Sequence, residues 1–370
     1  KGTLPTITRG TKSCSSCDAS IGNYVTATTT DAKGHFTLTG VPNGSNIPFV
    51  VQIGKWRRKV MLPSVTACKT AAVPAASSRL PKNHTEGDMP QMAILTGLAD
   101  QLGCFMYSLG IDASEFTAPG GSGRLQVFQG MGGSGVTGGT AGNCQSSSCP
   151  LWATKQDLEN YDIAVLACEG GEYTNTKTTA EIQNMHDWLN EGGKVFATHF
   201  HYVWFKDGPS DFSGAANWKG LSAGAGIGNY AVDTSFPKGK VFSEWLSNVG
   251  ALTNGTIAMS GVADSVGVVN KPTQRWIYDS SSTDVKYLSI LTPAGGIQSP
   301  DGGETPTYCG KAVFSDLHAG GTSLQADIPG GCQAGTLTAQ ELALEFLFFD
   351  LSACVADESV PPPPPPQPTK

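Results

Sequence analysis

The hydrophobic and polar positions of this chain change their period near residue 90. Before that point, apolar and polar residues alternate in short stretches, and turn sequences such as 31–34 separate them. An alternation of period two is typical of half-buried β-strands, so we expect strands at 24–30, 35–39 and 47–54. Residues 1–72 are therefore predicted to form a small all-β domain.

From residue 91 to residue 356 the pattern predicts strands that alternate with amphipathic helices. Continuous apolar runs are typical of strands buried on both faces, and a period near 3.6 predicts helices. We therefore expect an α/β domain with a mostly parallel sheet and helices on both faces. The predicted strands are 92–95, 124–129, 161–167, 194–198, 285–291 and 311–315, and the predicted helices are 99–109, 154–160, 179–190 and 338–351.

Three further segments complete the predicted organisation. Residues 73–90, rich in Ala, Pro and Ser, predict a linker. Residues 206–284, rich in Gly, Ser and Asn, predict a long insertion with a helix near 239–249. Residues 357–370 form a proline-rich tail, which predicts polyproline II without a core of its own. Its consecutive prolines are Pro361, Pro362, Pro363, Pro364, Pro365 and Pro366.

The cysteine content indicates an exported protein. There are 10 cysteines, and the 6 histidines lie too far from them for zinc-finger spacing. We favour structural disulfides, which indicate an oxidising compartment. The cysteines assigned to disulfides are Cys14, Cys17, Cys68, Cys104, Cys144, Cys149, Cys309, Cys332 and Cys354. The expected pairs are Cys144–Cys149, Cys309–Cys332, and one of Cys14 or Cys17 with Cys68.

Charge and hydropathy narrow the range of partners. The net charge of −7 argues against a nucleic acid, because little on this chain would neutralise a run of phosphates. The basic cluster at 55–59 is short, and we expect it to be a solvated strand edge. The chain has no apolar run of the roughly 18 residues that a membrane span needs.

One segment of the N-terminal part resembles a known repeat. Residues 30–44 run Thr-Asp-Ala-Lys-Gly-His-Phe-Thr-Leu-Thr-Gly-Val-Pro-Asn-Gly, which is similar to the TDxxGxFxLxxVPxG pattern of the carboxypeptidase regulatory-like family. The resemblance implies a transthyretin-like β-sandwich that serves as a spacer or an interaction module. Residues 1–20 show little strand pattern, so the sandwich has either an open edge for another chain or a local strand at 4–8.

The larger domain resembles the class I glutamine amidotransferase-like fold, particularly its ThuA-like branch. Segments 161–171, 192–199 and 310–318 carry the resemblance, since they match a YDxxxLxxGG turn, a GGxxxGxx strand and a GRVFxxxLGH strand. It implies a flavodoxin-like arrangement. Amidotransferases place a cysteine nucleophile at the position of His199, with a histidine at the position of His318. Cys168 lies one strand earlier, and we interpret it as a disulfide cysteine or buried thiol.

Polar residues nevertheless collect at the predicted carboxyl edge of the sheet. They are Glu169, Glu172, His199, His201, Asp316 and His318. His199, His201, His318 and Asp316 could hold a divalent metal such as zinc, because His199 and His201 would share one face of a continuing strand. Two alternatives are hydrogen-bonded structural histidines and a metal-free ligand pocket. The candidate catalytic residues are His199, His318, Asp316 and Glu169.

Taken together, the displaced nucleophile and the spacer-like module weigh against an enzyme. We expect a structural or interaction protein that assembles with copies of itself or with other envelope proteins and needs no cofactor. The architecture resembles secreted proteins of myxobacterium-like bacteria, which implies an extracellular or outer-surface location. The alternative is a secreted metal-dependent hydrolase that acts on carbohydrate or peptide. A sugar-binding module, suggested by Tyr202, Trp204 and Trp218, is a third hypothesis.

Overall fold

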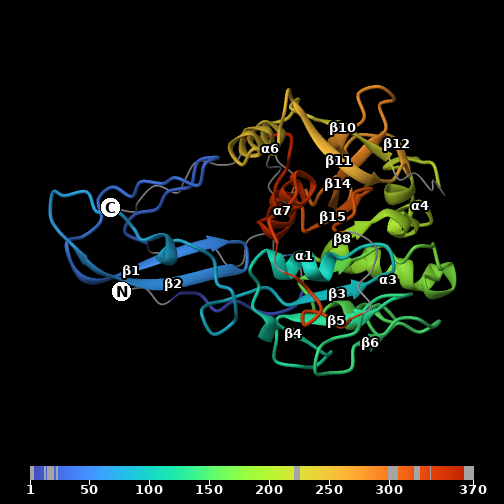
Figure 1. The fold of residues 1–370 in the computed structure, drawn as a ribbon, viewed down its shortest axis with the longest axis horizontal. Coiled ribbons are helices and arrows are strands. Elements are labelled where there is room, and N and C mark those ends of the chain that lie inside the picture. Colours follow the sequence, from blue (N-terminus) through green and yellow to red (C-terminus); the bar gives the residue numbers. More distant parts are fainter. Residues whose placement is uncertain are drawn as a thin grey trace.

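A computed structural model describes most of the chain and places its elements (Figure 1). The described residues are 4–11, 14, 21, 24–220, 226–298, 307–320, 326–333 and 335–361. Cys17 and the prolines after Pro361 lie outside them, so the predictions made for these residues stay predictions. No helix within the described ranges is long and apolar enough to cross a membrane.

An 11-stranded sheet forms the centre of the α/β part, in the order β11-β10-β13-β14-β15-β8-β7-β3-β5-β4, with β6 also paired to β5. The segment from β15 to β5 is parallel, as predicted, whereas β14, β13, β10 and β11 pair antiparallel. The strands are β3 (Met92–Thr96), β4 (Phe116–Thr117), β5 (Leu125–Gln129), β6 (Gly142–Asn143), β7 (Ile163–Leu166), β8 (Lys194–Thr198), β10 (Gly226–Val232), β11 (Thr256–Val262), β13 (Gln274–Tyr278), β14 (Val285–Thr292) and β15 (Gly310–Ser315).

The predicted insertion is part of this sheet. Strands β10, β11 and β13 all come from residues 206–284 and extend the antiparallel side. Burial alternates along most of β11, where Ile257, Met259 and Val262 are buried between more exposed neighbours. This alternation is typical of strands with one covered face. A second sheet pairs β9 (Ala216–Trp218) with β12 (Val266–Val269).

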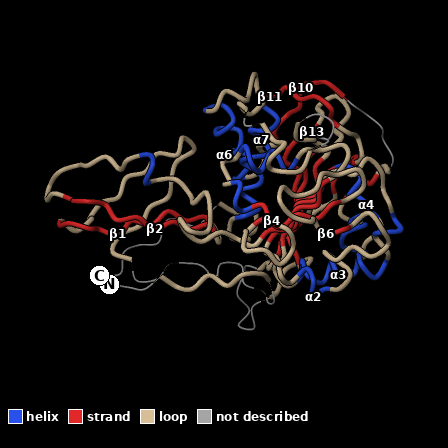
Figure 2. Tube along the Cα trace, turned by 60° about the horizontal axis from the view of Figure 1, so that its bottom comes forward, coloured by secondary structure: helices blue, strands red, loops and turns tan. Residues whose placement is uncertain are grey.

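Helices cover both faces of the sheet, as predicted (Figure 2). One buried cluster joins α1, α6 and α7 to strand residues such as Ile94 and Val165, and the other joins α2 to α5 to residues such as Leu95 and Leu166. Neighbouring strand residues thus point to opposite faces, so both faces are covered. The helices are α1 (Leu102–Ser108), α2 (Lys155–Leu158), α3 (Thr179–Asn190), α4 (Val203–Lys206), α5 (Ser210–Ser213), α6 (Pro237–Asn248) and α7 (Ala339–Ser352).

Local sequence explains where the longer helices begin. Thr178 and Glu181 form a capping box at the start of α3, and Thr338 and Glu341 form one at the start of α7. In each box the threonine hydroxyl accepts the backbone N–H of the glutamate, and the carboxylate accepts the backbone N–H of the threonine. These contacts satisfy N–H groups that the first helical turn leaves unpaired.

The N-terminal part contains a long hairpin that extends away from the α/β domain (Figure 1). It pairs β1 (Gly44–Ile53) with β2 (Trp56–Val65). The turn at 31–34 is present, and Phe36 stacks on Phe49 with ring centroids 5.7 Å apart. The predicted strands at 24–30 and 35–39 run without strand pairing, so among the described residues the module has this two-stranded sheet only. The sandwich and its boundaries remain predictions.

The basic cluster at 55–59 is an anchor, not the solvated edge that we expected. Trp56 and Arg57 are 2% and 4% exposed. Arg57 forms an ion pair with Asp88. Lys55 forms one with Asp162, the residue directly before β7. Trp56 and Arg57 are therefore buried because they join the hairpin to the larger domain, whereas Lys59 is exposed, as expected.

The disulfides confirm only part of the predicted pairing. Cys144 pairs with Cys149, as expected. The pair Cys309–Cys332 is wrong, because Cys309 pairs with Cys14 and Cys332 with Cys104. Cys354 is also in a disulfide, whereas Cys68 is free and exposed. The observed partners are 295 and 228 residues apart, so folding and not proximity along the chain brings them together. These disulfides are compatible with an oxidising, extracellular location.

Candidate functional site

The candidate site lies where adjacent parallel strands end. Strands β7, β8 and β15 are neighbours in the sheet and run parallel, so their carboxyl ends meet at one edge. Cys168 follows β7, His199 follows β8 directly, and His318 follows β15. Open α/β sheets place their ligand sites at this edge. The three side chains come together there.

These residues form a group that could hold a metal ion. One ligand atom from each of Cys168, His199 and His318 lies within 4.8 Å of the other two. The Cys168 Sγ atom is 3.5 Å from His199 Nδ1. A tetrahedral zinc ion with ligand bonds of about 2.0–2.3 Å separates its ligand atoms by about 3.3–3.6 Å. The Cys168–His199 distance therefore suits a shared ion.

The backbone at His199 turns its ring toward this group. His199 has a left-handed backbone conformation, with φ 41°, and begins a 3-10 turn at His199–Tyr202. Such a φ is uncommon for a residue other than glycine and often occurs at functional sites. The ring stacks on Phe200 with centroids 4.0 Å apart and lies nearly perpendicular to His318, at 5.1 Å.

His318 is oriented by the backbone. Its Nδ1 is 2.7 Å from the carbonyl oxygen of Gly261, which can only accept, so Nδ1 carries the donated proton. Among the described residues, the buried Nε2 has no hydrogen-bond partner. Metal-binding histidines are commonly fixed in this way by a carbonyl on the second ring nitrogen. Burial alone would lower the pKa of His318, but the Cys168 sulfur and the Asp100 carboxylate raise that pKa to about 9. Without a bound metal, the surroundings of the ring therefore favour its protonated form, and a metal ion at Nε2 would take the place of that proton.

His201, which we expected among the ligands, is held elsewhere. Its Nε2 donates to the carbonyl oxygen of Ala167 at 3.0 Å, and its Nδ1 accepts the indole N–H of Trp204 at 3.2 Å. Burial holds the pKa of His201 well below its usual range. The expectation assumed a strand through His199 and His201, whereas the 3-10 turn separates their directions.

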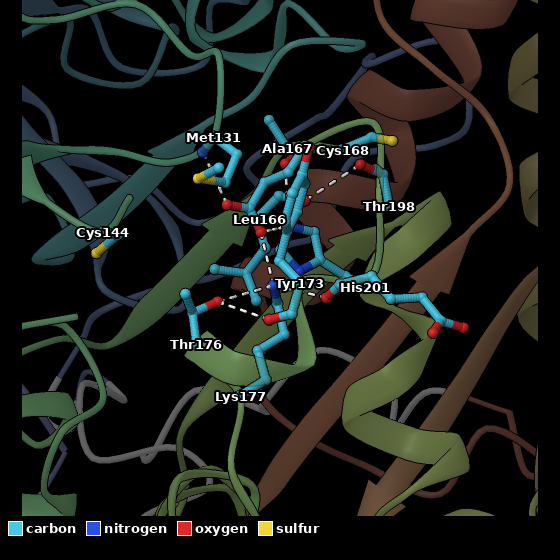
Figure 3. Close-up of polar contacts among 12 residues, drawn as sticks. Met131, Cys144, Leu166, Ala167, Cys168, Tyr173, Thr176, Lys177, Thr198 and His201 are labelled. Carbon is cyan, nitrogen blue, oxygen red and sulfur yellow. Dashed lines mark hydrogen bonds and ion pairs between the residues drawn. The ribbon is translucent and has the colours of Figure 1, made fainter. Parts of the chain in front are cut away.

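The acidic candidates are also engaged elsewhere. Glu169 is buried, pairs with Lys177 at 2.7 Å, and accepts the backbone N–H of Met131. Figure 3 shows Lys177 and His201 on one side of the β7 end, while the Cys168 sulfur points to the Thr198 side. Asp316 is fully buried and accepts the backbone N–H of Ser265 at 2.8 Å. Burial raises the pKa of Asp316 to about 6. Glu172 binds Tyr202 and Lys206.

Cys168 is a buried thiol, one of the two states expected of it, but its position beside two histidines was not predicted. It is the only described free cysteine that is buried, and it faces two histidines. Its position at the end of a predicted strand was the available signal. We gave that signal less weight because the resemblance placed the nucleophile one strand later.

Comparison with known proteins gives little beyond the fold. The sequence matches no protein-family model and no curated protein. Among solved structures, the chain is similar to a ThuA-like protein from Bacteroides uniformis, with 12% identity and a TM-score of 0.34. The match covers 70% of this chain and 88% of that one. It is a likeness to part of the fold and assigns the chain to no family.

Proposed function

We propose that this protein is an exported metal-dependent hydrolase whose ion is held by Cys168, His199 and His318. The observation that carries the proposal is the convergence of one thiol and two imidazoles within 4.8 Å. Catalytic zinc sites use three protein ligands and leave the fourth position for water, whereas structural sites use four. Export is supported by the disulfides.

The ligands suggest how such a site would act. A thiolate and two neutral imidazoles leave one positive charge on a divalent ion, which lowers the pKa of bound water to about 7. Cys168, His199 and His318 would hold the ion, and the ion would supply a Lewis acid and an activated water for hydrolysis of an amide or ester bond in a peptide or carbohydrate. Cys168 and His199 are buried and His318 is half-buried, so what solvent exposure the site has lies on the side of His318.

Metal analysis of the purified protein tests the proposal. We expect one zinc or similar ion per chain and a clear loss of binding in Cys168→Ser, His199→Ala and His318→Ala. Cys68→Ser is the matched control, because Cys68 is also a free cysteine but is exposed. His35→Ala is the histidine control, on the exposed turn of the N-terminal part.

Hydrolysis is measured on peptide, ester and acetylated-sugar substrates before and after removal of the metal with a chelator. We expect activity that disappears with the metal and returns with zinc. A wild-type protein without stoichiometric metal, or with activity that survives all three ligand substitutions, would contradict the proposal.

A second proposal, a surface interaction role, rests on the hairpin. Strands β1 and β2 pair with each other alone among the described strands, and Met61 on β2 is 51% exposed. An unpaired strand edge can accept a strand from another copy. Sedimentation over a range of concentrations should then show self-association that weakens in Met61→Lys, and a wild type that stays monomeric throughout would contradict it.

A further inference from the structure

Asp100 is hydrogen-bonded to residues next to two of the proposed metal ligands, and no sequence pattern indicated this. It follows β3 at the carboxyl edge of the sheet and is 3% exposed. Its Oδ2 accepts the hydroxyl of Thr198 at 2.7 Å. Its Oδ1 accepts the backbone N–H of Ala319 at 2.8 Å. One buried carboxylate therefore joins the ends of two different strands.

The third strand end, which carries Cys168, is held by the residue next to Asp100. The chain neighbours of Asp100 strengthen these contacts. Ala99 donates its backbone N–H to the Cys168 carbonyl at 3.0 Å, and Gln101 donates to the Ala319 carbonyl at 2.9 Å. Residues 99–101 are thus hydrogen-bonded to the turn after β7, which carries Cys168, and to the turn after β15, which carries His318.

Gly97 explains how this segment comes so close. A Cβ atom at position 97 would lie 2.2 Å from the Cys168 carbonyl oxygen, which is too short for any side chain. Glycine is therefore required where the loop after β3 crosses the end of β7. This close approach places Asp100 within hydrogen-bonding distance of Thr198 and Ala319.

We infer that Asp100 is the positioning residue that sets the geometry of the Cys168, His199 and His318 group. Asp100 accepts hydrogen bonds from the residue before His199 and the residue after His318, and its neighbour Ala99 donates to the carbonyl oxygen of Cys168, so each ligand is within one residue of a hydrogen bond made by residues 99–100. The inference rests on the proposed metal site and adds the residue that holds it in place. Partners behind the ligands commonly change metal affinity 10–100-fold when they are removed.

Asp100→Asn tests the inference, because the amide keeps the size of the carboxylate but has only one acceptor oxygen. We expect the zinc affinity of this variant to fall about 10–100-fold while the protein remains folded. In the cobalt-substituted protein, the thiolate-to-cobalt absorption band should shift or weaken. A residue that only stabilises the fold would leave that band unchanged.

Asp162→Asn is the matched control. Asp162 is another buried carboxylate, and it holds Lys55 and the Gln91 backbone N–H at the opposite end of β7. We expect it to lower the stability without changing the cobalt spectrum. Wild-type affinity and spectrum in Asp100→Asn would overturn the inference while the metal site stands. A wild type that binds no metal would overturn the proposed function, and the inference with it.

Discussion

At the scale of single residues, backbone contacts place the side chains of the candidate site. His199 is turned by its left-handed backbone conformation, and His318 is turned by the carbonyl oxygen of Gly261. No sequence pattern predicts either the His199 backbone conformation or the His318–Gly261 hydrogen bond, because both depend on segments that are distant along the chain. The sequence named both histidines as candidates, but it did not predict that Cys168 would face them.

A residue-scale prediction concerns Glu86, which forms two hydrogen bonds with Arg79 at 2.6 Å and 2.7 Å. The Arg79 guanidinium lowers the pKa of Glu86 from 4.5 to about 2. The folded-state pKa lies below the unfolded one, so the pair stabilises the fold above pH 4.5 and loses this effect as the pH falls toward 2. Both side chains are partly exposed, so the stabilisation is about 1 kcal/mol.

Urea denaturation of Glu86→Gln checks this. We expect the variant to be less stable than the wild type by about 1 kcal/mol at neutral pH, and the difference to shrink steadily in acid. Glu244→Gln, at an exposed position of α6, is the control. A difference that does not depend on pH would show that the ion pair is not responsible.

At the scale of elements, the periodicity of the sequence was a good guide. The predicted helix 179–190 and strand 194–198 match α3 and β8, and the other predicted strands of the parallel region agree within a few residues. These elements are determined locally, because a buried face and a capping box fix both the period and the start of a helix. The insertion was harder to interpret, since its strands gain their hydrogen bonds only from the sheet.

The disulfides give an element-scale prediction. The Cys104–Cys332 bond joins residues 228 positions apart, whereas Cys144–Cys149 closes a separation of 5. The loss of chain entropy predicts stabilisation of about 5 kcal/mol for the long loop and about 2 kcal/mol for the short one. Cys104→Ser/Cys332→Ser should therefore lower the free energy of unfolding more than Cys144→Ser/Cys149→Ser.

Chemical denaturation of the two double variants under oxidising conditions measures the difference. An equal loss in both would mean that local packing, and not loop closure, determines the effect of these bonds.

At the scale of the whole molecule, Trp56 and its neighbours join the hairpin to the α/β domain. Trp56 is 2% exposed and packs edge-on against Phe349 of α7, with ring centroids 5.9 Å apart. The neighbouring ion pairs of Lys55 and Arg57 connect the same regions. Loss of one buried tryptophan typically costs about 3–5 kcal/mol.

Trp56→Ala should therefore release the hairpin while the central sheet stays folded. We expect proteolysis within residues 66–90 to become several-fold faster, with the α/β domain recovered as a resistant fragment. Met61→Ala, on the exposed side of the same strand, is the control and should leave the rate unchanged. Cooperative loss of the entire structure in Trp56→Ala would contradict this expectation.

The sequence by itself determined the elements of the parallel region, the alternation of helices over its two faces and the two histidines at its edge. Those features follow from patterns among neighbouring residues, because such patterns determine the local conformation of the chain. The tertiary structure decided which cysteines pair, how the insertion joins the sheet, and that Cys168 replaces His201 beside His199 and His318. These outcomes depend on strands that are far apart in sequence and adjacent only after folding. Asp100 belongs to the same group, because its hydrogen-bond partners Thr198 and Ala319 come from two separate strand ends.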